Sequence, residues 1–113
     1  MTNYAVGHLA EECAARYLKR MGYEVVDINW KTRSCEIDIV AMQRKRVYFI
    51  EVKYRKTNNQ GSGLEYITAK KLDQMNFAAR LWLSQNDWDG DYCLGAIEVS
   101  GQDFEITNFL TDL

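Results

Sequence analysis

Apolar positions recur along the chain with two different periods, which predict helices and strands in a definite order. Over residues 6–21 they fall every three or four positions, the spacing of an amphipathic helix. Residues 23–30, 35–42 and 47–54 are rich in β-branched and aromatic side chains, which favour strands. We expect the last two of these strands to form a hairpin, because only the polar residues 43–46 separate them.

The second half of the chain adds one helix and two strands. Residues 56–63 are the least hydrophobic stretch and predict a mobile loop. Residues 66–85 carry an apolar stripe at helical spacing, and residues 92–99 and 104–109 have the composition of short strands. We therefore predict an α/β fold: a single domain over residues 1–113, with a central mixed sheet of about five strands flanked by helices.

The composition is that of a folded domain in a reducing compartment. Of the 113 residues, 47% are hydrophobic and 27% are charged, which is typical of globular chains. No apolar run is long enough to cross a bilayer, and charged residues within the first twenty exclude the apolar stretch of a signal peptide. The three widely spaced cysteines suggest neither a disulfide framework nor a zinc site. We expect a cytoplasmic protein with no membrane partner.

The distribution of charge predicts that a polyanion would meet the middle of the chain. The formal net charge is −2, unlike that of a uniformly basic nucleic-acid-binding protein. Residues 31–56 nevertheless hold eight basic residues against three acidic ones, whereas no lysine or arginine follows Arg80. A nucleic acid should therefore contact the middle segment and avoid the C-terminal third.

Charged residues interrupt two of the predicted strands at positions where burial is expected. Glu51 and Lys53 stand two residues apart in the strand at 47–54, and therefore on one face of it. In the preceding strand, Glu36 and Asp38 share one face by the same alternation. If the hairpin closes at its two central turn residues, Asp38 falls opposite Glu51 and the two carboxylates lie close together.

Two opposed carboxylates repel each other, and a divalent cation relieves that repulsion. Mg²⁺ is typically bound by one or two carboxylates together with substrate phosphate, so Asp38 and Glu51 are candidate ligands for Mg²⁺ or Mn²⁺. Lys53 beside such an ion could orient a water nucleophile or stabilise charge that develops on a phosphodiester. In the alternative interpretation, Lys53 and Arg55 neutralise the acids in a structural ion-pair ladder. The spacing alone leaves both interpretations open.

Each predicted helix adds a charged side chain to this region. Glu11 lies at the border of the apolar stripe and can face the sheet, whereas Glu12 points to solvent. The alternative for Glu11 is an ordinary helix-start acid favoured by the helix dipole. Lys71 lies on the packed face of the second helix, so its ammonium either reaches inward to a phosphate or extends to solvent. Phe77 and Leu81 lie on the opposite face, which would suit a second contact surface such as a dimer interface.

Taken together, these motifs resemble those of a known family. They are Glu11-Glu12, CEIDIVA at residues 35–41, FIEVKYR at residues 49–55, and Lys71. The chain resembles the YraN-type family of small bacterial proteins, which belongs to the restriction-endonuclease-like, PD-(D/E)xK superfamily and is similar in pattern to archaeal Holliday junction resolvases. The resemblance covers nearly the whole chain and implies a restriction-endonuclease-like fold.

The resemblance also implies a role for each motif residue. Asp38 and Glu51 would bind the metal, with the main-chain carbonyl of Val52 as a further ligand. Lys53 would be the catalytic lysine, and Glu11 would complete the metal site through water. Glu36 and Arg55 would be supporting members. The basic middle segment and the second helix supply the candidate nucleic-acid contacts Arg55, Lys56 and Lys71.

We therefore expect a Mg²⁺-dependent nuclease that hydrolyses phosphodiester bonds in DNA, with branched and single-stranded forms as candidate substrates. A branched substrate needs two symmetric cuts, so a homodimer is a candidate assembly. Two departures from the family pattern, Ala10 and Cys35 in place of glycines, add bulk beside the expected site. With the negative net charge, they favour an alternative: a non-catalytic nucleic-acid-binding or protein-interaction module on a nuclease-like fold.

Overall fold

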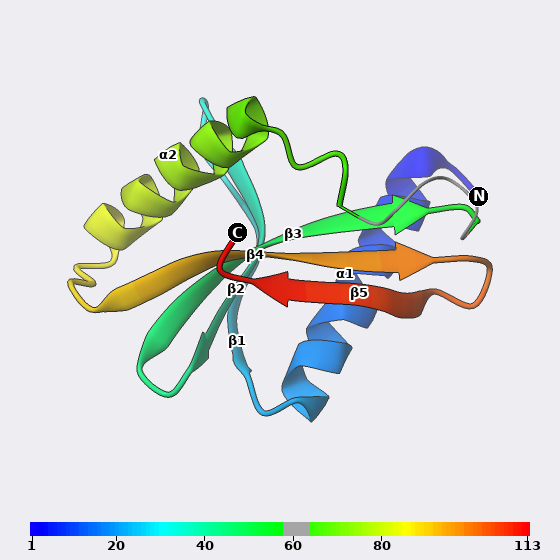
Figure 1. The fold of residues 1–113 in the computed structure, drawn as a ribbon, viewed down its shortest axis with the longest axis horizontal. Helices are drawn as coiled ribbons and strands as arrows, with labels where there is room; N and C mark the ends of the chain where they lie inside the picture. Colours follow the sequence, from blue (N-terminus) through cyan, green and yellow to red (C-terminus); the bar gives the residue numbers. More distant parts are fainter. Residues whose placement is uncertain (58–63) are drawn as a thin grey trace.

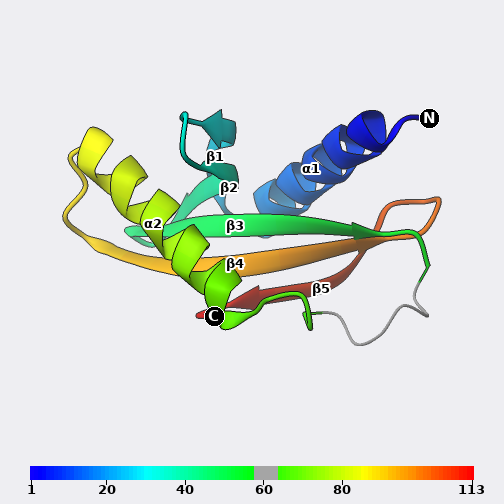
Figure 2. The same ribbon diagram turned by 90° about the horizontal axis from the view of Figure 1, so that it is seen from above.

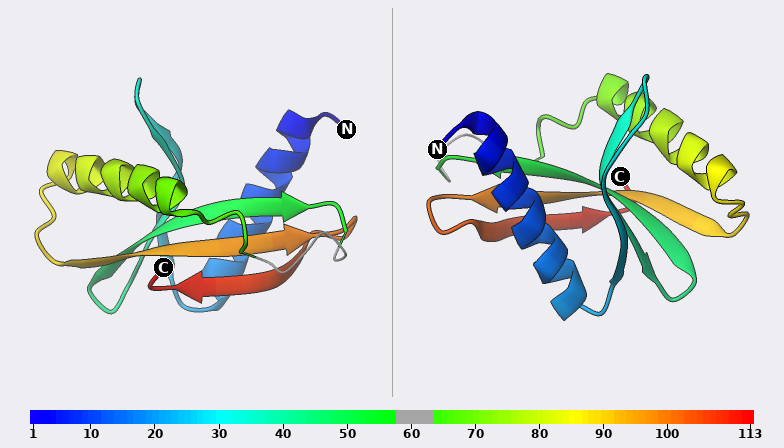
Figure 3. Two further views of the ribbon diagram at one scale, coloured as in Figure 1. Left: turned by 45° about the horizontal axis from the view of Figure 1, so that its top comes forward. Right: turned by 180° about the vertical axis from the view of Figure 1, so that it is seen from behind.

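Within the described residues, 1–57 and 64–113, the computed structural model has two helices on opposite faces of one five-stranded sheet (Figures 1 and 3). The elements in chain order are α1 (Asn3–Arg20), β1 (Glu24–Lys31), β2 (Glu36–Gln43), β3 (Arg46–Arg55), α2 (Ala69–Gln85), β4 (Asp91–Ser100) and β5 (Glu105–Thr111). The predicted α/β class, mixed sheet and order of elements are confirmed. Most of the loop predicted at residues 56–63 lies outside the described residues.

The strands follow the chain order across the sheet, β1-β2-β3-β4-β5. Neighbouring strands are antiparallel except β3 and β4, which run parallel. A parallel pair needs a crossover connection, and α2 supplies it between β3 and β4. This connection brings α2 back over the strands that will form the candidate site (Figure 1).

Alternating side chains of β3 enter two separate cores, one beneath each helix. Ile50 packs in the core beneath α1, with Leu18. Phe49, next to it in the chain, packs beneath α2 with Trp82. Because successive strand residues point to opposite faces, Glu51 continues the series of Phe49 and faces α2.

Threonine caps fix where both helices begin. Thr2 Oγ1 accepts a hydrogen bond from the Ala5 N–H at 3.0 Å, so α1 begins before the apolar repeat does. Thr68 Oγ1 accepts one from the Lys71 N–H at 3.1 Å. The predicted start of the second helix near residue 66 is therefore too early, and Tyr66 lies before the helix. Neither helix in the described part of the chain has the length and apolar content that a membrane span requires.

The turn between β2 and β3 has a geometry that its residue types do not predict. Arg44 and Lys45 have φ angles of 51° and 63°, as in a type I′ turn, which more often uses Asn-Gly. The hairpin closes around these two residues, and the predicted register is confirmed as far as the pair of Ile39 and Ile50. Beyond that pair the two strands separate.

Candidate metal and nucleic-acid site

The gap between β2 and β3 beyond Ile39 and Ile50, here called the fork, is built around one carboxylate. At the next position Asp38 Oδ2 accepts a hydrogen bond of 2.8 Å from the Val52 N–H. The Asp38 side chain therefore takes the place of a backbone carbonyl of β2. The prediction that Asp38 lies directly opposite Glu51 in the ladder is wrong, because the two backbones have already separated there.

The fork opens because β2 turns away from β3 and out of the plane of the other strands (Figure 2). In a regular strand Ile37 and Ile39 would share one face. Ile39 packs in the core beneath α1, whereas Ile37 packs beneath α2 with Trp82. β1 follows this turn, since Trp30 pairs with Ile37. Apolar packing against α2 therefore favours the open fork.

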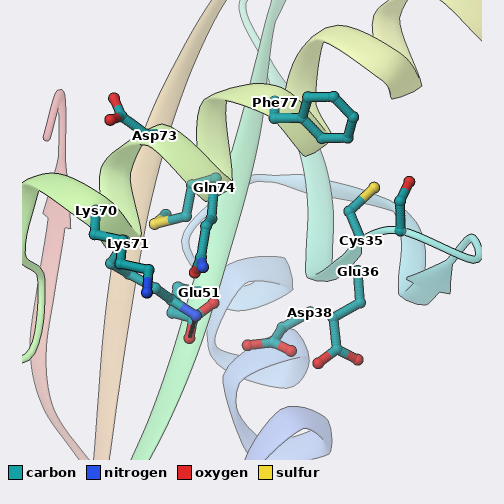
Figure 4. A pocket seen from close by; sticks show the side chains of 11 residues that line it. Cys35, Glu36, Asp38, Glu51, Lys70, Lys71, Asp73, Gln74 and Phe77 are labelled. Carbon is teal, nitrogen blue, oxygen red and sulfur yellow. Dashed lines mark ion pairs between the residues drawn. The ribbon is translucent and has the colours of Figure 1, made fainter.

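A cavity of about 530 Å³ lies between the fork and α2 (Figure 4). Its lining residues are Ser34, Cys35, Glu36, Asp38, Glu51, Lys70, Lys71, Asp73, Gln74, Met75 and Phe77. The cavity thus brings together four of the charged residues that the sequence singled out: Glu36, Asp38, Glu51 and Lys71.

The carboxyl group of Asp38 is strongly perturbed by its surroundings. Its pKa is raised from 3.8 to about 7, first by burial and then by repulsion from the Glu51 carboxylate, with a smaller effect of Glu11. The hydrogen bond from the Val52 N–H acts in the opposite direction, because it stabilises the carboxylate. The metal-free site therefore keeps a proton to a much higher pH than an ordinary aspartate does. A cation at the same place would relieve the same repulsion.

Glu11 reaches Asp38 from α1. Its side chain is 16% exposed, whereas Glu12 is exposed. Burial raises the pKa of Glu11, and its interactions with His8 and with the Asp38 side chain act in the opposite direction. Among the described residues the buried Oε1 of Glu11 has no hydrogen-bond partner, and His8 Nδ1 is 4.0 Å away. Glu11 therefore offers an unused acceptor next to Asp38.

Lys71 brings a positive charge into the cavity from α2. Its Nζ lies 3.0 Å from Glu51 Oε2 (Figure 4), so the inward one of the two predicted orientations is the one found. The two side chains are 34% and 22% exposed, and water therefore screens the pair. Lys71 neutralises Glu51 in the absence of a metal ion.

The oxygen donors at the fork fit a hard divalent cation. Asp38 and Glu51 line the cavity, and the carbonyl of Val52 points to the side of its N–H, because both groups of a strand residue face the same neighbour. Among the described residues, no group of three or more His, Cys, Asp or Glu side chains is arranged to hold a metal. Mg²⁺ commonly uses one or two carboxylates and completes its shell with waters and substrate phosphate.

The other predicted basic residues do not line the cavity. Lys53 is exposed, and its Nζ lies over the ring of Tyr66, 5.8 Å from the centroid. The Nε of Arg55 donates a hydrogen bond to Oε2 of the buried Glu98. Lys56 is exposed just after β3. The ammonium of Lys53 thus stays outside the cavity, although the residue stands on the predicted face of its strand.

Sequence reasoning missed Tyr66 and Glu98. The Tyr66 hydroxyl is buried without a hydrogen-bond partner in the described part of the chain, and burial, together with Glu51 and Glu98, raises its pKa. No local pattern marks this residue. Glu98 is 5% exposed in an apolar strand, and a lone acid in such a strand was a usable signal, because a buried carboxylate needs partners.

Comparison with known proteins finds a family whose matched region includes every residue of this site. The profile of "Uncharacterised protein family UPF0102" matches residues 10–104, a span that includes the fork, the cavity and Glu98. The chain belongs to this family. UPF0102 is the YraN-type family that the motifs resemble.

Relatives in UPF0102 match the chain over nearly its full length. The UPF0102 protein of Vibrio parahaemolyticus is 37% identical over 102 residues, which cover 87% of this chain and 84% of the relative. That of Sulfurihydrogenibium sp. is 38% identical over 104 residues, 90% of each chain. That of Helicobacter pylori strain HPAG1 is 36% identical over 107 residues, 95% of this chain and 91% of the relative.

Proposed function

We propose that this UPF0102 protein is a metal-dependent nuclease that hydrolyses phosphodiester bonds in DNA. The observation that carries the proposal is the cavity that brings the buried carboxyl group of Asp38 together with Glu51. Burial and the Glu51 carboxylate both raise the pKa of Asp38. Such a site favours a divalent cation in place of the proton. Lys70 and Lys71 line the adjoining cavity, and their charges favour the approach of a polyanion.

Asp38, Glu51 and the carbonyl of Val52 would hold Mg²⁺ or Mn²⁺. The bound ion would supply Lewis-acid stabilisation of phosphoryl oxygens and a water of lowered pKa. Glu11 would accept a hydrogen bond from a water through its buried Oε1. Lys71 would leave Glu51 and bind a phosphate of the substrate instead.

We assign to Lys53 a direct role in the hydrolysis reaction. It stands two residues after Glu51 in β3, and its flexible stem lets the ammonium move from the Tyr66 ring toward the cavity. There it would orient the attacking water or stabilise the charge that develops on the phosphodiester. Lys56 would contact the nucleic-acid backbone. Arg55 would contribute to that contact and support β3 through its ion pair with Glu98.

A cleavage assay tests this proposal. Purified protein with Mn²⁺ is expected to nick flapped, branched or single-stranded DNA. Lys53→Ala should lower the rate at least a hundredfold, because loss of one donor that stabilises developing charge costs about 10²–10³-fold. Glu12→Gln, on the exposed side of α1, is the matched control and should cleave like the unmodified protein. Cleavage that survives both Lys53→Ala and Asp38→Asn would contradict the proposal.

Lys71→Met is expected to tighten Mn²⁺ binding and to weaken DNA binding. The ammonium competes with the cation for Glu51, and a partly exposed ion pair is worth about 0.2–1 kcal/mol, so the affinity for Mn²⁺ should rise up to about fivefold. Calorimetry measures the first effect and fluorescence anisotropy of a labelled oligonucleotide the second. Lys70→Met removes a charge from the same cavity wall and should tighten Mn²⁺ binding less. Weaker Mn²⁺ binding by Lys71→Met would show that the two cations do not compete.

A non-catalytic nucleic-acid-binding module is the second candidate. It is favoured by the ammonium of Lys53, which lies over Tyr66 and outside the cavity, and by the net charge of −2. Calorimetry separates the two candidates. DNA binding without Mn²⁺ binding would favour the module, whereas Mn²⁺ binding that is lost in Glu51→Gln would favour the nuclease.

A nuclease of this kind would work in the cytoplasm, where its DNA substrate lies. The cysteines Cys13, Cys35 and Cys93 are free, as a reducing compartment would keep them. A homodimer belongs to the proposal only for a branched substrate, whose two strands need symmetric cuts.

A further inference from the structure

Phe77 is an exposed aromatic residue at the cavity of the proposed metal site. Its side chain is on α2, 56% of the residue is exposed, and it lines the same cavity as Asp38 and Glu51. It takes no part in the buried stripe of α2, which consists of Met75, Ala78, Ala79 and Trp82. The packing of the helix therefore does not account for a large apolar side chain at this position.

The cavity is larger than a metal site needs. A cation with six waters would occupy roughly 180 Å³, at about 30 Å³ for each water. The cavity measures about 530 Å³, so most of its space remains for an organic group. Lys71 and Glu51 line one end, and Phe77 lines the other, beside Cys35 (Figure 4).

We propose that Phe77 stacks on an unpaired base of the strand whose phosphodiester is bound at Asp38 and Glu51. This inference rests on the proposed nuclease function and names its substrate class: single-stranded or locally unpaired nucleic acid. Phe77 follows Lys71 by six positions, about 9 Å along the helix axis, which allows one end of the cavity to hold a phosphate and the other its base. In an intact duplex the neighbouring bases already cover both faces of each base, so the ring has nothing to stack on.

The composition of the cavity supports a nucleotide over other occupants. Single-stranded nucleic acid is bound by lysines along its backbone together with aromatic rings that stack on its bases, whatever their sequence. Lys70 and Lys71 supply the first and Phe77 the second, all from one helix. Single exposed apolar residues are common on protein surfaces. Leu110 of β5, which is 48% exposed and does not line the cavity, serves as the control for that ordinary case.

Oligonucleotide binding by a cleavage-deficient protein tests the stacking role. Anisotropy of an end-labelled single-stranded DNA 12-mer and of the blunt 12-bp duplex is measured with the Lys53→Ala protein in Mn²⁺. The single strand should bind at least fivefold more tightly than the duplex. Adding Phe77→Ala should weaken single-strand binding about 5- to 150-fold, the range for loss of one stacked base. Phe77→Trp should retain the affinity, and Leu110→Ala should change it less than twofold.

Failure of the stacking role is distinguishable from failure of the nuclease function. If the unmodified protein cleaves with Mn²⁺ but Phe77→Ala binds the single strand within twofold of its parent, the stacking role alone is wrong. Equal affinity for duplex and single strand would overturn it as well. If no cleavage occurs but Phe77→Ala loses single-strand binding and Phe77→Trp keeps it, the nuclease function is wrong and the stacking role stands. Phe77 is exposed, so these variants should fold, which their unfolding transitions will verify.

Discussion

Asp38→Asn is expected to stabilise the metal-free protein by about 2–4 kcal/mol at pH 8 and to abolish Mn²⁺-dependent cleavage. At pH 8 the unmodified protein holds a buried carboxylate beside Glu51 and Glu11. Asparagine removes the charge, and its amide oxygen can still accept the hydrogen bond from the Val52 N–H. The variant therefore keeps the structure of the fork while losing a metal ligand. Urea unfolding in EDTA measures the stability.

The pH dependence of this effect follows from the direction of the pKa shift. The folded protein keeps the Asp38 proton up to about pH 7, whereas the unfolded chain loses it near pH 3.8. The unmodified protein should therefore lose stability as the pH rises from about 4 to 7, and Asp38→Asn should not share this loss. The gain should vanish near pH 4. Asp73→Asn, which removes an exposed carboxylate from the same cavity, should change stability by less than about 0.5 kcal/mol. A less stable Asp38→Asn protein at pH 8 would contradict the charged-site interpretation.

Glu98→Ala is expected to destabilise the protein by about 3–5 kcal/mol, the usual result of removing one partner of a buried ion pair. Glu98 Oε2 accepts the hydrogen bond from Arg55 Nε, and Oε1 accepts those of Thr107 at 2.9 Å and Asn108 at 3.3 Å. The substitution removes the acceptor for all three from the interface of β3, β4 and β5. Chemical denaturation measures the loss.

Two further variants test why Glu98→Ala should lose stability. Glu98→Gln keeps one acceptor oxygen but no charge, so it should lie between Glu98→Ala and the unmodified protein. Glu105→Ala, an exposed acid of β5, should stay within about 0.5 kcal/mol of it. If Glu98→Ala lowered the free energy of unfolding as little as Glu105→Ala, the hydrogen bonds of Glu98 would not stabilise the fold.

The fold was predictable because its signals are local. The helical spacing of apolar residues marked α1, and the density of β-branched and aromatic residues marked the strands. The errors lie at the ends, where single contacts decide. The Thr68 cap starts α2 after Tyr66, and the Thr2 cap starts α1 before its apolar repeat.

The candidate site was predictable in its members but not in its geometry. Spacing identified Asp38 and Glu51, yet the fork depends on packing of Ile37 against α2, which follows more than thirty residues later. The pairing of Lys71 with Glu51 likewise joins elements that only the crossover connection brings together. Such long-range contacts leave no periodic trace in a sequence.

Calorimetric titration of the purified protein with Mn²⁺ at pH 6 and pH 8 tests most directly whether Asp38 and Glu51 form a metal site. With the Asp38 pKa at about 7, we expect binding about tenfold tighter at pH 8, because the proton must leave before the metal binds. Asp38→Asn should bind no Mn²⁺ at either pH. Absence of Mn²⁺ binding by the unmodified protein, or undiminished binding by Asp38→Asn, would contradict the metal site and the nuclease function built on it.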